Sequence, residues 1–142
     1  METLRFLHSY LAYIVVITVA LASVNSIISM FTKKEFGAKD FRLALFGLIF
    51  THTQVLLGII FFVFANDFGE TPMGEIMKSS VLRLKNVEHP MLMVIAVILL
   101  TIGYSKHKNM RTSASKFKIL AITYSLAFIA ILAMIPWSTW LG

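Results

Sequence analysis

Two histidines, His8 and His89, each stand at the start of a long apolar stretch of the chain. A neutral imidazole nitrogen is the commonest metal ligand among protein side chains. We expect both residues to lie at the same end of a helical bundle, on parallel helices at opposite corners, where they would face each other. The sequence therefore predicts one metal centre with His8 and His89 as its ligands. The alternative is two hydrated histidines at helix ends.

The composition indicates an integral membrane protein. Of the 142 residues, 58% are hydrophobic and only 14% are charged, and a soluble domain of this length cannot bury so much apolar sequence. The chain has no cysteine, which excludes disulfides, iron–sulfur clusters and thiolate ligation of haem. Its net charge of +6 lies mainly in the connections between apolar stretches, which favours orientation in a lipid bilayer over nucleic-acid binding.

Four apolar stretches predict four membrane spans. About 20 helical residues, at ~1.5 Å each, cross a hydrocarbon core of ~30 Å. The first stretch exceeds the apolar region of a signal peptide, so we expect it to be retained. The fold class is therefore all-α, an integral membrane four-helix up-down bundle in one domain (residues 1–142). The expected spans are residues 6–31, 43–65, 90–105 and 117–136.

The connection between the second and third spans, residues 66–88, is long enough to contain structure of its own. Thr71-Pro72 is typical of a helix start. A possible apolar stripe follows, and it predicts a short amphipathic helix that lies on the outer face of the membrane. The stripe comprises Ile76, Met77, Val81 and Leu84.

Basic residues predict the orientation. The connections 32–42 and 105–118 carry nine Lys and Arg, whereas residues 66–88 carry three, and short cytoplasmic loops are the richer in these residues. Both termini would then lie outside a bacterial-type inner (cytoplasmic) membrane, although Arg5 is on the less basic side. An outer aromatic belt is expected from Tyr10, Tyr13, Trp137 and Trp140.

Small residues continue the helix faces that carry the two histidines, among them Ala12 after His8 and Ala96 after His89. They leave room either for a flat cofactor or for close helix packing. Since imidazole is a common axial ligand and bundle cores often hold cofactors, we expect one haem b with bis-histidine iron near the outer face. Filled axial positions favour electron transfer over oxygen chemistry.

The other two histidines receive different interpretations. His52 lies near mid-membrane, where an ionisable group is a functional candidate; it would contact the edge of the cofactor or serve a proton or quinone path. An ordinary interhelical hydrogen bond explains it equally well. His107, 18 residues after His89, would lie ~27 Å away along a helix, so it cannot share that site, and its basic neighbours predict a solvated loop.

Arg83 and Lys85 precede His89 on the predicted outer side. Cations at the aqueous edge of the bundle would neutralise the propionates of a haem. The alternative is the solvated face of an amphipathic helix.

Three segments of the chain resemble one four-helix half of the haem A synthase fold. Residues 7–13 (Leu-His-Ser-Tyr-Leu-Ala-Tyr) and 88–92 (Glu-His-Pro-Met-Leu) are similar to the segments in which a histidine opens the first and third helices of that bundle. Residues 54–58 (Gln-Val-Leu-Leu-Gly) resemble its Gln-x-x-Leu-Gly stretch. The resemblance implies haem ligation by His8 and His89, with Gln54 nearby.

A second resemblance, to small four-helix membrane proteins called cytochrome B, extends over nearly the whole chain. It includes residues 81–84, 103–108 and 135–138.

The chain departs from haem A synthases in three ways. Those proteins have two such bundles, an acidic residue where this chain has Arg5 and an arginine where it has Ser9. The resemblance therefore implies haem binding rather than catalysis.

The expected function is a b-type cytochrome that moves single electrons, as a subunit beside a respiratory or quinone-using complex in the bilayer. We do not expect a catalyst or a nucleic-acid partner. Two alternatives belong to other classes: a haem-modifying enzyme, and a cofactor-free structural or assembly subunit. The last would use the small residues at Gly47, Gly58, Ala96 and Gly103 for helix packing.

Overall fold

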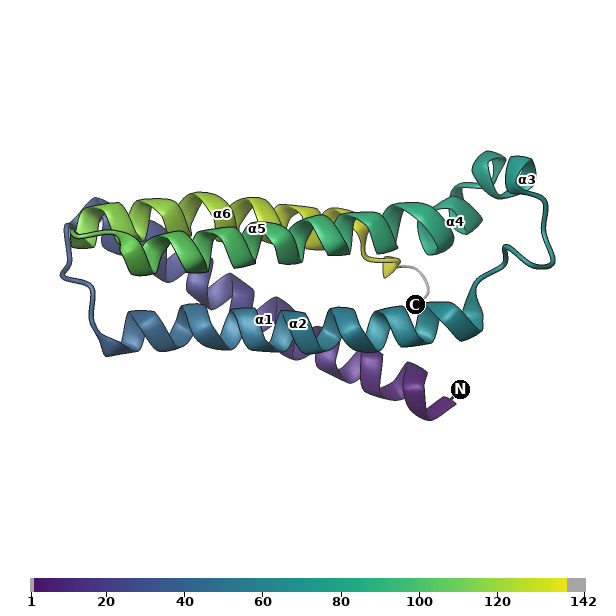
Figure 1. Cartoon of the computed structure of the whole chain (residues 1–142), viewed down its shortest axis with the longest axis horizontal. Helices are drawn as coiled ribbons and strands as arrows, with labels where there is room; N and C mark the ends of the chain where they lie inside the picture. The colour runs from purple at the N-terminus through teal and green to yellow at the C-terminus, as the bar shows by residue number, and fades with distance from the viewer. Residues whose placement is uncertain (1, 138–142) are drawn as a thin grey trace.

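The computed structural model describes residues 2–137, and these contain helices and no strand. The long helices lie side by side, and smaller helical segments lie in the connection between the second and third of them (Figure 1). The long helices are α1 (Glu2–Thr32), α2 (Ala38–Ala65), α5 (His89–Asn109) and α6 (Ser113–Met134). The connection contains α3 (Met73–Lys78), α4 (Ser80–Arg83) and the π-helical segment η1 (Leu84–Glu88).

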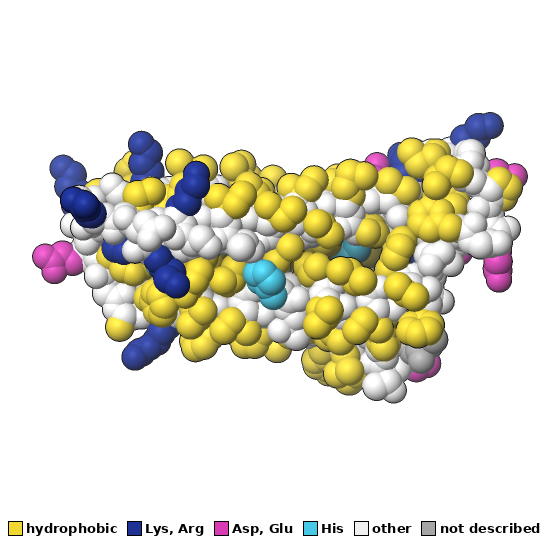
Figure 2. Space-filling view, in the orientation of Figure 1, with side chains coloured by type: hydrophobic (Ala, Val, Ile, Leu, Met, Phe, Trp, Pro, Cys, Tyr) yellow, Lys and Arg dark blue, Asp and Glu magenta, His cyan; other side chains and the backbone are white. Residues whose placement is uncertain are grey.

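Within residues 2–137, four helical segments are long and apolar enough to cross a membrane, in agreement with the predicted class. On the face drawn in Figure 2, hydrophobic side chains cover most of the length, and Lys and Arg gather at one end. The third segment runs without interruption over Ser80–Asn109, so it begins before the expected start at residue 90. Pro90 lacks the N–H that would bond one turn back, and the chain accommodates it with a π turn instead of a new helix start.

The four long helices form the predicted arrangement of corners. α1 packs on α2 and α6, and α5 packs on the same two helices. α1 and α5 therefore lie at opposite corners and run in the same direction (Figure 1). Both begin at one end of the bundle, which we call the histidine end; the other end, where α1 connects to α2 and α5 connects to α6, is the basic end.

Small residues permit the closest approaches between helices. A side-chain carbon added at Gly103 of α5 would overlap the Thr123 side chain of α6, and one at Gly47 of α2 would lie 3.4 Å from the Tyr124 ring. Tyr124 is fully buried and donates a 2.7 Å hydrogen bond to the Ala44 carbonyl. Gly47 and Gly103 thus allow close packing inside this chain.

His107 lies at the basic end, and the prediction that it is solvated was wrong. Its side chain is only 1% exposed, and its ring contacts Phe36 and Phe41. Nδ1 of His107 is 2.5 Å from the Tyr104 carbonyl oxygen. α5 continues to Asn109, so residue 107 is still helical and shares the buried face of Ala96, Leu100 and Gly103.

The connection of residues 66–88 contains the predicted short helix, α3, but it is only six residues long. Ile76 of α3 is buried, whereas Met77 and Val81 are exposed. The four-residue stripe is therefore not continuous, because Ser79 ends α3 and its hydroxyl caps α4 by accepting from the Leu82 N–H.

Three aromatic residues of the expected belt lie at the histidine end: Tyr10 and Tyr13 near the start of α1, and Trp137 after α6. Their side chains are 60%, 44% and 42% exposed. Trp140 lies outside the described residues.

Candidate functional site

The structure brings the His8 and His89 rings together at the histidine end. Their centroids are 6.4 Å apart and their planes are inclined at 85°. His8 is in the second turn of α1 and His89 is the first residue of α5, so the pair faces across the diagonal of the bundle. Both side chains are half-buried. That the two residues bind a metal stays a prediction.

The separation of the rings suits two ligands of one metal atom. A histidine nitrogen binds a metal at about 2.0–2.1 Å, so two imidazoles on opposite sides of one atom have their centroids roughly 6–6.5 Å apart. The observed 6.4 Å falls in this range. The distance between the two rings is therefore compatible with two histidine ligands of one metal atom.

A backbone carbonyl orients His89. Nδ1 of His89 is 2.8 Å from the carbonyl oxygen of Met134, the last residue of α6. That carbonyl has no partner within its own helix because it belongs to the final turn. A hydrogen bond from Nδ1–H to it leaves Nε2 as the unprotonated nitrogen, the arrangement by which metal-bound histidines are usually fixed.

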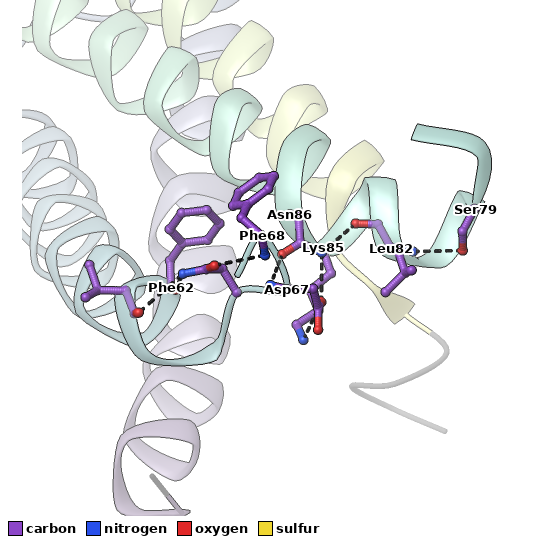
Figure 3. A network of polar contacts seen from close by, with 9 residues as sticks. Phe62, Asp67, Phe68, Ser79, Leu82, Lys85 and Asn86 are labelled. Carbon is purple, nitrogen blue, oxygen red and sulfur yellow. Dashed lines mark hydrogen bonds and ion pairs between the residues drawn. The ribbon is translucent and has the colours of Figure 1, made fainter. Parts of the chain in front are cut away.

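A polar network holds the chain just before His89 (Figure 3). Asn86 of η1 is buried; its amide donates to the Asp67 carboxylate and the Leu82 carbonyl, both at 2.9 Å, and accepts from the Asp67 N–H at 2.9 Å. Lys85 contacts the same carboxylate at 3.0 Å. The network connects the chain directly after α2 to the π turn that precedes His89.

The sequence analysis placed residues 66–88 at the outer end, but it did not identify the polar network between Asn86 and Asp67. The bonds from Asn86 and then Lys85 lower the pKa of the Asp67 carboxyl below its usual value. Pro90 was the sequence signal for an unusual turn before His89, because a proline that continues a helix requires a local change of geometry upstream.

α2 forms the surface against His8. Gln54 Nε2 donates a 2.7 Å hydrogen bond to the His8 carbonyl, and the Phe61 ring is stacked with the imidazole at a centroid distance of 5.9 Å. Gly58 lies between these two residues on the same face of the helix. A side-chain carbon at Gly58 would lie 3.0 Å from His8 Cε1, so glycine leaves the ring its space.

Two polar atoms of this contact have no partner. His8 Nδ1 and Gln54 Oε1 are both buried and form no hydrogen bond in the structure of residues 2–137. Buried polar atoms of this kind are rare in native proteins and call for an explanation.

The predicted cations lie at the histidine end, and each has an acidic partner. Arg83 Nε is 3.1 Å from Glu88 Oε2, and its Nη1 donates to the Met77 carbonyl at 2.8 Å. Lys85 pairs with Asp67, and about half of its side chain is exposed.

Ala96 and Ala12, the two small residues predicted on the helix faces that carry the histidines, differ in burial. Ala96 is completely buried in the hydrophobic core cluster, so there its size serves helix packing. Ala12 of α1 is only half-buried.

His52 is separated from the His8–His89 pair. It lies on the exposed face of α2, with Nδ1 2.8 Å from the Leu48 carbonyl and Nε2 3.3 Å from Thr101 Oγ1 of α5. Thr101 is 12 residues beyond His89, which corresponds to ~18 Å along a helix. The structure thus contains the interhelical contact that was one interpretation of this histidine.

No family model matches the chain, and the comparisons found no similar curated protein and no similar solved structure.

Proposed function

We propose that the protein is a small membrane b-type cytochrome in which His8 and His89 are the axial ligands of one haem. The observation that carries the proposal is the facing pair of imidazoles, 6.4 Å apart on diagonal helices, one of them already oriented by the Met134 carbonyl. The resemblance of residues 7–13 and 88–92 to haem-binding segments supports it further.

The donor set favours haem over a bare metal ion. Among the described residues, no three or more His, Cys, Asp or Glu side chains cluster closely enough to hold a metal. A protein zinc site usually has three or four protein ligands. Haem supplies four ring nitrogens of its own, and two histidines complete its iron, as this pair would.

The residues of the chain have distinct roles in this proposal. Nε2 of His89, whose Nδ1 is held by Met134, would bind the iron. A ring nitrogen of His8 would be the second ligand from α1, and Gly58 leaves space beside that ring. When bound, the haem supplies a one-electron iron couple. Arg83 and Lys85 would offer positive charge to its propionates, in exchange with Glu88 and Asp67.

The cellular setting follows from the charges. We place the basic end in the cytoplasm and the histidine end outside a bacterial-type inner membrane, because nine basic residues lie in the first and third connections and three in the second. A redox partner in the bilayer, either a quinone or another respiratory subunit, would then exchange electrons near the outer surface.

Absorption spectroscopy tests the proposal directly. The protein purified from haem-replete cells should show a low-spin b-type reduced-minus-oxidised spectrum, with about one haem per chain. His8→Ala or His89→Ala should remove the low-spin signal while the helical circular dichroism is kept. His52→Ala is the matched control and should keep the signal, because its ring contacts Thr101 and not the pair.

Two other results would replace the proposal. A colourless, stably folded wild type would favour the cofactor-free structural subunit. High-spin haem together with a modified porphyrin product would favour the haem-modifying enzyme.

A further inference from the structure

Two buried side-chain atoms that lack partners belong to Gln54 and His8, two residues joined by a hydrogen bond. Gln54 uses its amide nitrogen on the His8 carbonyl, 2.7 Å away, while its amide oxygen has no partner. His8 Nδ1 is likewise buried without a partner. A single contact between α1 and α2 thus combines one hydrogen bond with two unsatisfied polar atoms.

The two unsatisfied atoms are complementary in chemistry. In neutral imidazole one ring nitrogen carries a proton and must donate it, and an amide oxygen can only accept. A small rotation of the imidazole, in the space that Gly58 leaves beside Cε1, would pair Nδ1–H with Oε1.

We propose that Gln54 is the positioning residue of His8: its amide oxygen accepts from His8 Nδ1–H while its amide nitrogen holds the His8 carbonyl. The two bonds would fix both the backbone and the tautomer of His8, leaving Nε2 unprotonated and available as a ligand. Gln54 thereby does for His8 what the Met134 carbonyl does for His89. The effect of Gln54 on haem binding rests on the proposed function, whereas its effect on the His8 tautomer does not.

The choice of glutamine has a chemical consequence. A neutral amide acceptor leaves the ligand an imidazole, whereas a carboxylate in its place would draw the Nδ1 proton and give the ring imidazolate character. The added negative charge would stabilise ferric iron and lower the reduction potential. Gln54→Glu keeps an acceptor for Nδ1–H but loses the donor to the His8 carbonyl, whereas Gln54→Leu removes the acceptor and the donor together.

The first test uses the haem-free protein and nitrogen NMR of the histidine rings in detergent micelles. In the wild type the His8 signals should report the tautomer protonated at Nδ1. In Gln54→Leu this preference should be lost, while the His89 signals, fixed by Met134, should stay unchanged. A wild-type ring protonated at Nε2, or one unaffected by Gln54→Leu, would overturn the inference.

The second test uses the haem-loaded full chain. Gln54→Leu should lose haem about 10- to 100-fold more readily, as is typical when the partner of a metal-bound histidine is removed. Gln54→Glu should lose haem less readily than Gln54→Leu, because it keeps the acceptor for Nδ1–H, and should shift the midpoint potential below that of the wild type. Thr53→Val is the matched control, because the Thr53 hydroxyl bonds only to the Ile49 carbonyl of its own helix.

The outcomes separate the two proposals. If the wild type binds no haem, the proposed function fails, and the NMR result alone decides the role of Gln54. If the wild type binds low-spin haem and Gln54→Leu melts earlier but keeps the wild-type potential and retention, Gln54 is only a structural link between α1 and α2. If Gln54→Leu does not fold, an unchanged midpoint potential in Gln54→Glu overturns the positioning role in the same way.

Discussion

The two ends of the bundle both contain histidine, but the polar atoms around these residues are bonded differently. At the basic end the Asp40 carboxylate, almost inaccessible to solvent, accepts from Asn25, Lys34 and the Gly37 N–H at 2.8–2.9 Å. His107 bonds through Nδ1 and packs between aromatic rings. At the histidine end, His8 Nδ1 and Gln54 Oε1 are buried with nothing to bond.

This difference distinguishes buried polar groups that stabilise the fold from buried polar groups that are available to a ligand. A polar group that is desolvated and fully paired stabilises one conformation, whereas one left unpaired costs free energy unless something else binds there. The basic end is a closed corner that fastens α1 to α2 and α5 to α6. At the histidine end two buried polar atoms remain unbonded, which is consistent with the proposed ligand site.

Replacement of a histidine by alanine should have different effects on stability and on haem binding at the two ends of the bundle. His107→Ala should destabilise the protein by about 2–4 kcal/mol, because it empties a fully packed space and removes a hydrogen bond. It should leave the low-spin haem spectrum of the remaining folded protein unchanged. Denaturant titration in detergent, followed by circular dichroism, measures the first effect, and absorption measures the second. A His107→Ala protein of normal stability that loses its haem would reverse the assignment of the two ends.

Asn86→Ala tests whether the polar network prepares the histidine end. The substitution leaves the Asp67 N–H and the Leu82 turn without their partner, and we expect a loss of about 1–2 kcal/mol. Because the π turn precedes His89, we also expect a change in the electron paramagnetic resonance of the ferric haem. Asn66→Ala is a control on the preceding turn, since its amide bonds mainly within its own helix end. An unchanged resonance in Asn86→Ala would show that His89 is held by Met134 alone.

The smallest expected effect concerns pH. The folded state lowers the pKa of Asp67, so its ionised form contributes stability above the usual carboxyl pKa of about 4, and this contribution is lost as the pH falls through the lower folded value. Asp67→Asn should therefore be less stable than the wild type near neutral pH, and the gap should close below about pH 4. Paired thermal melts at neutral and acidic pH would detect it. A gap that persists at acidic pH would mean that Asp67 acts through its shape and not its charge.

Several features could be predicted from the sequence because they depend on local quantities. Hydropathy and helix rise place four spans, and the positions of His8 and His89 within their spans put both at one end. The burial of His107 was missed because its charged neighbours suggested a loop, whereas α5 continues to Asn109 with the spacing of its buried face intact. The start of the third helical segment was misplaced because Pro90 is compatible with a helix start and with a π turn alike.

The chain alone determined that this is a membrane protein with four spans and a pair of histidines at a common depth, since length and apolarity decide these. Only the tertiary structure decided which groups meet those histidines: the Met134 carbonyl on one and Gln54 with Gly58 on the other. Each span is apolar around most of its circumference, so its pattern says little about its rotation. That rotation comes from close packing at Gly47 and Gly103, which brings together residues distant in the chain.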